Sequence, residues 1–256
     1  MKCVILAAGY ATRLRPLTDD VPKHLLPVGE RPMLDWVLDA VREVEDVDEI
    51  HLVTNSRFAA AFERWAGPND VSVHDDGTRS NDDRLGAVGD LWLAIEEAGL
   101  ERDEICVLAG DNLFDFSLPG FVEWWRSKPQ PASAVPLHDV GDLGLAKQYG
   151  IADTDASERI VRFVEKPSEP TSTLASTLIY LLPPEHVRLV RTYLDEGLSP
   201  DNAGSFLGWL ANREPVYGYL FEGTWYDIGD RTQLLEADNR LRRLAGLAMR
   251  KSYSLD

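Results

Sequence analysis

The sequence predicts an α/β protein built on a doubly wound, mostly parallel sheet that also contains antiparallel strands. Short apolar segments of strand length alternate with longer amphipathic segments through the first half, and this alternation favours parallel strands connected by helices. The second half is richer in strand-like segments, which predicts a mixed extension of the same sheet. No internal repeat or low-complexity linker divides the 256 residues, so we expect one domain over residues 1–256.

The first half shows its elements in a regular order. Its short apolar runs predict strands at residues 2–7, 49–54, 71–74 and 105–109. Helices are expected at residues 33–44, 58–66 and 86–98. The first and last of these place apolar residues on one helical face, namely Leu34, Val37, Leu38 and Val41, and Leu91, Ala94, Ile95 and Ala98.

The second half predicts strands at residues 133–138, 150–153, 160–165, 176–181 and 216–221. Two helices are expected between them, at residues 185–195 and 203–212, and a C-terminal helix at about 232–245. In open α/β sheets, ligands bind beyond the carboxyl ends of the strands. The polar motifs described below all follow predicted strands, so we expect them to share that edge.

The charge of the chain limits its partners. The formal net charge is -17, and only six of the 26 basic residues are lysines. Without a basic stripe to offset phosphate repulsion, a nucleic-acid partner is not expected. One explanation of the acidity is a halophilic type of surface, which stays hydrated in a salt-rich cytoplasm. An activity optimum at low salt would count against that hypothesis.

The N-terminus and the cysteines favour a cytoplasmic protein. The segment MKCVILAAG has no extended apolar region of a signal peptide, and we interpret it as the first strand. No run approaches the roughly 20 apolar residues that cross a bilayer. Cys3 and Cys106 both fall in predicted buried strands and are expected to be small core residues.

A loop suited to phosphate binding follows the first strand. Small residues at Ala7, Ala8 and Gly9 let backbone N–H groups approach an anion closely. Positive charge follows within a few residues, at Arg13, Arg15 and Lys23. The segment contains neither a G-x-G-x-x-G dinucleotide fingerprint nor a Walker A sequence. The alternative is a surface loop with solvated arginines.

Two aspartates are candidate metal ligands. Asp111 follows Gly110 at the end of an apolar strand, and Asp227 lies between apolar residues in a later one. Carboxylates in such places suit Mg²⁺. A turn-forming Asp111 and a capping or buried hydrogen-bonding Asp227 are the alternatives.

Residues 6–28, LAAGYATRLRPLTDDVPKHLLPV, resemble the signature of the sugar-phosphate nucleotidylyltransferase family. The resemblance implies a nucleotide-binding Rossmann-like topology, with nucleotide bound by about residues 1–115 and sugar phosphate by about 116–230. It also implies that Arg13 stabilises the phosphates and the departing pyrophosphate, and that Lys23 contacts the phosphates at the reacting centre. Asp111 and Asp227 match the motifs that hold Mg²⁺ in the family.

The sugar-phosphate half of the site rests on the same resemblance. Residues 163–167 resemble the family segment F-x-E-K-P, which implies that Lys166 holds the sugar phosphate and Glu165 accepts a sugar hydroxyl group. Gly150 matches a glycine that lies against the sugar ring, and Tyr180 matches a neighbouring contact. The chain departs from the family pattern at Ala11 and Leu178, where relatives have glycine.

Base recognition is expected between the third strand and the helix that follows. The pair Leu85-Gly86 resembles a family pair whose backbone meets the base, and Asn81 stands five residues earlier. An amide offers both a donor and an acceptor, which matches uracil or thymine. A purine remains an alternative, as does a polar loop that caps the next helix.

The resemblance implies Mg²⁺-dependent transfer of a nucleotidyl group from a nucleoside triphosphate, with UTP or dTTP favoured, to a sugar 1-phosphate. The alternatives are cytidylyl transfer to another phosphorylated small molecule and a non-catalytic nucleotide or sugar-phosphate sensor. A metal-dependent glycosyltransferase is disfavoured because no D-x-D follows the central strand. No membrane partner is expected, and a homo-oligomer is compatible with the sequence.

Overall fold

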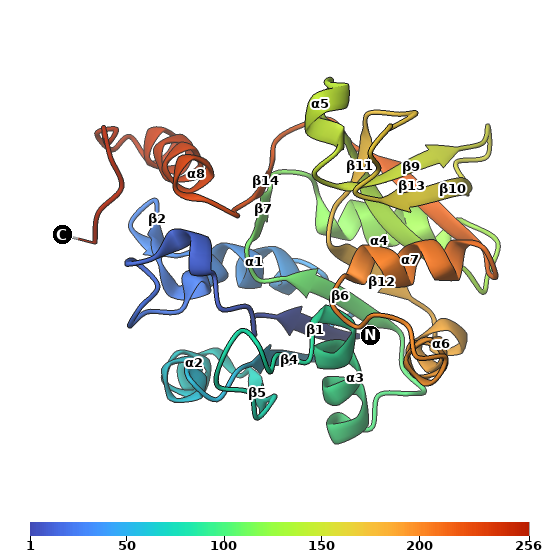
Figure 1. Ribbon diagram of the computed structural model, residues 1–256, viewed down its shortest axis with the longest axis horizontal. Helices are drawn as coiled ribbons and strands as arrows, with labels where there is room; N and C mark the ends of the chain where they lie inside the picture. The colour runs from blue at the N-terminus through green and yellow to red at the C-terminus, as the bar shows by residue number, and fades with distance from the viewer. Residues whose placement is uncertain (256) are drawn as a thin grey trace.

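A computed structural model describes residues 1–255 and centres on a ten-stranded mixed sheet (Figure 1). Strands from the N-terminal half form its parallel part: β1 (Lys2–Leu6), β4 (Glu49–Thr54), β5 (Ser72–Asp75) and β6 (Ile105–Ala109). β1 lies between β4 and β6, and β5 forms one edge. β1 and β6 are almost entirely buried, as strands covered on both faces must be.

The C-terminal half continues this sheet in mixed orientation. Its strands are β8 (Ser133–Asp139), β9 (Gly150–Thr154), β10 (Ile160–Glu165), β11 (Leu174–Ser176), β12 (Ile179–Leu182) and β13 (Val216–Leu220). β12 connects the two halves, because it pairs antiparallel with both β6 and β8. β13 is parallel to β8. Two small sheets lie apart: β2 (Pro27–Val28) with β3 (Arg31–Pro32), and β7 (Asn112–Phe114) with β14 (Trp225–Asp227).

Helices cover both faces of the sheet, which confirms the predicted α/β fold. One apolar layer contains α1 (Met33–Arg42), α2 (Ala59–Ala66), α4 (Leu118–Arg126) and α8 (Arg231–Leu244). The other contains α3 (Ala87–Ala98), α6 (Pro184–Asp195) and α7 (Ala203–Ala211). Alternate residues of β1 serve the two layers: Cys3 and Ile5 face the first, whereas Val4 and Leu6 face the second. Cys3 and Cys106 are buried free thiols, as expected.

The β2–β3 hairpin and the short α5 (Leu143–Ala146) were not predicted, and two larger features also differ from the prediction. The single strand expected at 176–181 is in fact two strands, β11 and β12. The chain leaves β11 at Thr177, whose backbone N–H donates to Pro136 O over 3.1 Å. β12 then begins beside β6. Helix α4 was not expected, since Pro119 and Gly120 interrupt its apolar pattern. Both residues lie in its first turn, where Ser117 Oγ accepts the Gly120 N–H over 3.1 Å.

The topology gathers the predicted motifs at one edge. β1 and β6 are parallel neighbours, so the loop after Leu6 and the Gly110-Asp111 turn lie side by side. β14 pairs antiparallel with β7, and its register places Asp227 opposite Asn112. The short α5 (Leu143–Ala146) lies above this edge in Figure 1. Between residues 1 and 255, no helix is long and apolar enough to cross a membrane.

Glycine is required at the start of α3 but not at its end, although both flanking glycines have positive φ. A Cβ on Gly86 would approach Pro200 O to 2.6 Å, whereas a Cβ on Gly99 would meet nothing within 4 Å. We expect Gly99→Ala to lower the free energy of unfolding by about 1 kcal/mol, and Gly86→Ala by about 3 kcal/mol, because the second adds a backbone clash. Urea denaturation of both variants measures the difference. Equal losses would contradict the close packing at Gly86.

Candidate active site

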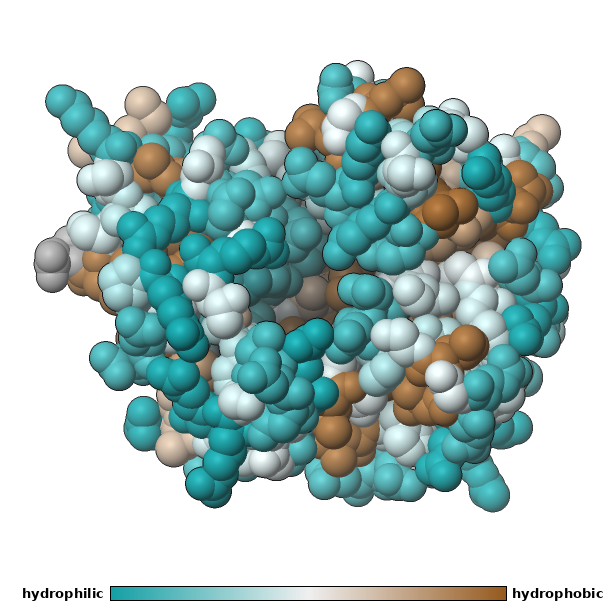
Figure 2. Space-filling view, viewed as in Figure 1, coloured by the Kyte–Doolittle hydropathy of each residue, from teal (hydrophilic) through white to brown (hydrophobic). Residues whose placement is uncertain are grey.

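A cleft of about 460 Å³ opens at this edge of the sheet, and Figure 2 shows the molecular face hollowed near its centre. Its walls come from both halves of the chain. Of the predicted site residues, seven line it: Arg13, Asp111, Gly150, Glu165, Lys166, Tyr180 and Asp227. The others lie in the loop after β1, in the 3₁₀ turn that carries Lys23, and in the segment that precedes α3.

The loop after β1 is fixed by backbone contacts. The Ala7 N–H donates to Val53 O over 2.9 Å, and Ala8 O accepts the Asn55 side-chain amide over 2.7 Å. Gly9 is exposed, and the space a Cβ would occupy there is open. An anion therefore has access to the backbone at Gly9, while its neighbours are held in the core.

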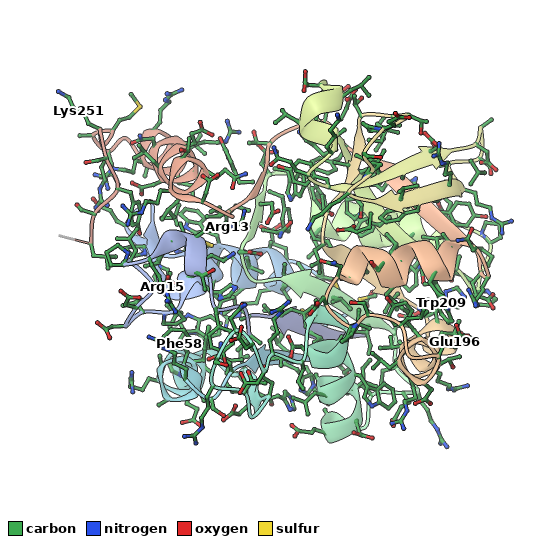
Figure 3. All side chains as sticks on the ribbon, in the orientation of Figure 1. Arg13, Arg15, Phe58, Glu196, Trp209 and Lys251 are labelled. Atoms are coloured by element: carbon green, nitrogen blue, oxygen red, sulfur yellow. The ribbon has the colours of Figure 1, made fainter. Side chains whose placement is uncertain are left out.

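Ala11, which stands where the family has glycine, adopts φ +45° and ψ +44°. This left-handed conformation disfavours residues with a side chain by roughly 1 kcal/mol or more. Two hydrogen bonds to Ala11 O hold the residue in this conformation: the Thr18 hydroxyl and the Leu14 backbone N–H both donate to it over 3.0 Å. The loop therefore keeps a glycine-like turn without glycine. Arg13 follows in the next turn and lies nearer the centre of the molecule than Arg15 (Figure 3).

Lys23 connects the loop to the two later motifs. It begins the 3₁₀ turn Lys23–Leu25, and its ammonium group donates to Asp111 Oδ2 and, over 2.9 Å, to Ile228 O. Burial alone would raise the pKa of Asp111, but the adjacent Lys23 charge holds it below the ordinary value. Asp111 is therefore a carboxylate near neutral pH. The sequence motif did not predict this direct contact.

Asp227 lies on the other side of Lys23. Burial, and then the charge of Asp111, raise the pKa of Asp227 to about 6, which indicates that the two carboxylates are close. The Ile228 N–H also donates to Asp111 O over 3.3 Å. Within residues 1–255, the Asp227 carboxylate has no hydrogen-bond or ion-pair partner.

These two carboxylates fit a hard divalent cation such as Mg²⁺, which prefers oxygen ligands and is usually held by one or two carboxylates plus water and phosphate oxygens. In the described part of the chain, no group of three or more histidine, cysteine or acidic residues has the geometry of a metal site. The two carboxylates therefore suit an ion whose remaining coordination positions are filled by oxygens of water and of a bound phosphate compound.

Asn112 and Trp225 are cleft residues that sequence reasoning missed. The Trp225 indole N–H donates to Asn112 Oδ1 over 2.6 Å, and the Asn112 amide donates to Asp111 Oδ1 over 3.2 Å. Because an indole N–H only donates, it fixes which end of the amide faces Asp111. The position of Asn112 directly after Asp111 was the available signal.

Small residues surround Glu165 at the end of β10. A Cβ on Gly150 would lie 2.8 Å from Glu165 Oε2, and a Cβ on Gly204 would overlap the same oxygen. Burial raises the pKa of Glu165, and the charge of Lys166 partly offsets this. Gly204, at the start of α7, was not predicted as a site residue; it follows a Pro-Asp-Asn segment that reads as an ordinary turn.

Lys166 and Tyr180 lie on the same wall but differ in exposure. The Lys166 side chain is 56% exposed, and the backbone N–H of Lys166 donates to Tyr149 O over 3.0 Å. Its ammonium group lies 3.8 Å from Glu165 Oε1. Tyr180 is 2% exposed, and burial raises its phenol pKa. Leu178, in place of a family glycine, also lines the cleft.

Of the two residues expected to meet the base, Gly86 packs near the cleft, whereas Asn81 lies away from its lining. Gly86 packs against Pro200, and the Val88 N–H donates to Pro200 O over 2.9 Å. Asn81 is exposed and does not line the cleft. Arg84 lies 3.2 Å from Asp201, which does line it.

The chain is similar in sequence to several known proteins. The family model described as nucleotidyl transferase matches residues 2–243. A UTP–glucose-1-phosphate uridylyltransferase of Synechocystis is 31% identical over 241 residues, covering 90% of this chain and 60% of that protein. A mannose-1-phosphate guanyltransferase of Debaryomyces hansenii is 29% identical, covering 92% and 63%. The chain therefore spans about 60% of the length of these relatives.

A solved structure supports the fold. A Bacillus anthracis protein assigned as a glucose-1-phosphate thymidylyltransferase, solved in complex with sucrose, superimposes with a TM-score of 0.80 at 27% identity. The match covers 94% of this chain and 95% of that one.

A buried acid in α3 predicts a pH effect on stability. Asp90, in α3, is 7% exposed, and burial, followed by the charge of Asp76, raises its pKa to about 8. The folded protein therefore binds an extra proton between about pH 4 and 8, so this contribution to stability is present at low pH and lost as pH rises through that range. We expect Asp90→Asn to raise the free energy of unfolding at pH 8 by roughly 1–3 kcal/mol and to change it little at pH 4.

Urea denaturation at the two pH values measures this effect. Asp82→Asn, at an exposed aspartate before the same helix, is the matched control and is expected to be neutral at both. A variant that destabilises equally at pH 4 and 8 would contradict a raised pKa at Asp90.

Proposed function

This chain belongs to the nucleotidyl transferase family, and from that premise we propose that it transfers a nucleotidyl group from a nucleoside triphosphate to a sugar 1-phosphate, releasing pyrophosphate. The observation that supports this proposal is that Lys23 donates to Asp111, and that Asp111 and Asp227 line one cleft together with Glu165 and Lys166. A reaction between two phosphate esters needs both a cation-binding centre and a second anion-binding group.

In the proposed reaction, an oxygen of the sugar phosphate attacks the α-phosphorus of the triphosphate in line. A new P–O bond forms, the bond to the β-phosphate oxygen breaks, and pyrophosphate leaves with that electron pair. The second pKa of a phosphate monoester is about 6, so the nucleophile is largely ionised at neutral pH and needs no general base. No histidine or cysteine among residues 1–255 lines the cleft, which is consistent with such a mechanism.

The residues of the chain align the reactants and offset their charge. We assign Lys23 and Arg13 to the triphosphate, because both bring positive charge to the Asp111 end of the cleft. Backbone groups of Ala7, Ala8 and Gly9 would approach the phosphates. Mg²⁺ held by Asp111 and Asp227 would supply charge neutralisation at the reacting phosphates.

The opposite wall is assigned to the sugar phosphate. Lys166 is exposed and 3.8 Å from Glu165, so its ammonium group is free to pair with a phosphate. Glu165 and Gly150 would contact the sugar ring, and Tyr180 would form the floor behind them. In this proposal, residues up to about 115 bind the nucleotide, and residues from about 116 to 230 bind the sugar phosphate.

For the base, we propose uracil or thymine, read by Asn81 and by the backbone at Gly86. Relatives named for uridylyl and thymidylyl transfer support this choice, and the guanyl-transferring relatives make GTP the principal competitor. The exposed position of Asn81 requires its loop to close over the base before the amide can act.

A matrix of triphosphates and sugar 1-phosphates tests the reaction. With Mg²⁺, we expect pyrophosphate release only when both substrates are present, and most rapidly with UTP or dTTP. Asp111→Asn should lower turnover roughly 100-fold or more without changing the unfolding midpoint by more than a few degrees. Asp20→Asn, in the loop between Arg13 and Lys23, is the matched control. Pyrophosphate release only with CTP and a different phosphorylated acceptor would instead support cytidylyl transfer. No release with any pair would support a non-catalytic sensor.

Lys166→Ala tests the sugar-phosphate wall separately. We expect the KM for the sugar phosphate to rise roughly 10–100-fold, because one charge-assisted hydrogen bond is lost, while nucleotide affinity stays the same. Steady-state kinetics and calorimetric titration with the nucleotide separate the two effects. Lys147→Ala, at an exposed lysine that does not line the cleft, is the control. A comparable loss of nucleotide affinity would rule out the role given to Lys166.

A further inference from the structure

Outside the cleft, four side chains form a continuous row at the sheet edge beside α3. Glu49 and His51 lie on β4, His74 on the edge strand β5, and Glu97 on α3. His51 Nδ1 is 3.1 Å from His74 Nε2. The outer ring nitrogens face the acids: His74 Nδ1 is 2.8 Å from Glu97 Oε2, and His51 Nε2 is 3.4 Å from Glu49 Oε2.

The two carboxylates determine where the ring protons lie. A carboxylate only accepts, so His74 carries its proton on Nδ1, facing Glu97. His51 is best paired when its proton is on Nε2, facing Glu49. Two neutral rings in these tautomers present their remaining lone pairs to each other across 3.1 Å. Moving the His51 proton to Nδ1 removes that conflict but turns its Nε2 lone pair toward the Glu49 carboxylate. In the second arrangement the rings share a hydrogen bond, and the buried His51 Nε2 is left without a donor, 3.4 Å from the Glu49 carboxylate.

A cation between the two rings removes the conflict. Acidic groups lie around the rings: Glu49 and Glu97 belong to the row, and Asp48 is next to it. Two basic groups partly offset them, because Lys2 bonds to Glu49 over 2.6 Å and to Asp48 over 3.0 Å, and the N-terminal ammonium group lies 3.6 Å from Asp48. His51 is 4% exposed, and its Nε2 has no hydrogen-bond partner within normal bonding distance. Burial, and then the neighbouring His74, lower the pKa of His51, which disfavours an additional proton at neutral pH.

We propose that His51 Nδ1 and His74 Nε2 bind one borderline divalent transition-metal ion of the Zn²⁺ class. Nitrogens about 2.0–2.1 Å from a tetrahedral Zn²⁺ lie about 3.3–3.4 Å apart, so the observed 3.1 Å needs an adjustment of only a few tenths of an ångström. Glu97 and Glu49 act as the outer partners that fix the tautomer of a metal-binding histidine. Water completes the coordination, because the His74 side chain, 11% exposed, lies on the edge strand.

This site differs in chemistry from the cleft. Imidazole nitrogens select Zn²⁺, Ni²⁺ or Cu²⁺, whereas the carboxylates Asp111 and Asp227 suit Mg²⁺. The bound ion would cross-link β4 to the edge strand β5, whose register places His74 opposite Val53. It would therefore stabilise an edge of the sheet without taking part in nucleotidyl transfer.

Calorimetric titration of the full chain with Zn²⁺ at pH 7.5, in excess Mg²⁺ to occupy the cleft, tests the proposal. We expect one site that is weakened at least tenfold in His51→Gln and in His74→Gln. Glu97→Gln should weaken it roughly tenfold while leaving it saturable. His138→Gln, at a histidine elsewhere on the sheet, is the matched control and should bind as the wild type does. Zn²⁺ should also raise the unfolding midpoint of the wild type and of His138→Gln, but not of the other two histidine variants.

Equal Zn²⁺ binding by the wild type and His74→Gln would overturn the proposal. So would nitrogen NMR that shows three ring protons on the His51–His74 pair at pH 7.5 together with no Zn²⁺ uptake, because the cation would then be a proton. A histidine variant that fails to fold does not obstruct the test, since Glu97→Gln and the NMR measurement address the same site with both rings intact.

Discussion

The site depends on the position of one ammonium group. Lys23 touches Asp111 at the end of β6 and the carbonyl of Ile228 just after β14, so it connects three segments that are far apart in sequence. Without this positive charge, two buried carboxylates would face each other in a poorly solvated place, and their repulsion would favour protonation or separation. The same charge keeps Asp111 ionised and so keeps the centre ready for a cation.

The sheet explains why one cleft could serve the two proposed substrates. Its parallel part ends in the loop after β1 and in Asp111, as open α/β sheets generally place ligand-binding residues at the carboxyl ends of strands. β12 attaches the antiparallel extension directly to β6. The extension carries Glu165 and Lys166, which line the same cleft as Asp111. Glycines at 150 and 204 then give the Glu165 carboxylate the space that it occupies.

Most of the fold was predictable from local patterns, whereas several site contacts depend on tertiary structure. The periodicity of residues 33–44 and 86–98 located α1 and α3 to within two residues. Helix α4 was missed because Pro119 and Gly120 stabilise a first turn only when Ser117 caps it. Asp111 and Asp227 were found as motifs, but their meeting requires the β7–β14 pair. The Trp225–Asn112 bond and the approach of Gly204 to Glu165 join residues that are far apart in the sequence, so no local pattern predicts these contacts.

The packing of Gly86 on Pro200 has an evolutionary consequence. The turn that precedes α7 lines the cleft through Asp201 and Asn202, and it rests on the backbone of the segment proposed for the base. Arg84 and Asp201 reinforce the same junction. Substitutions that reshape one pocket will therefore shift the other, so changes in preference for acceptor and for donor should arise as coupled sets of mutations in descendants of this protein.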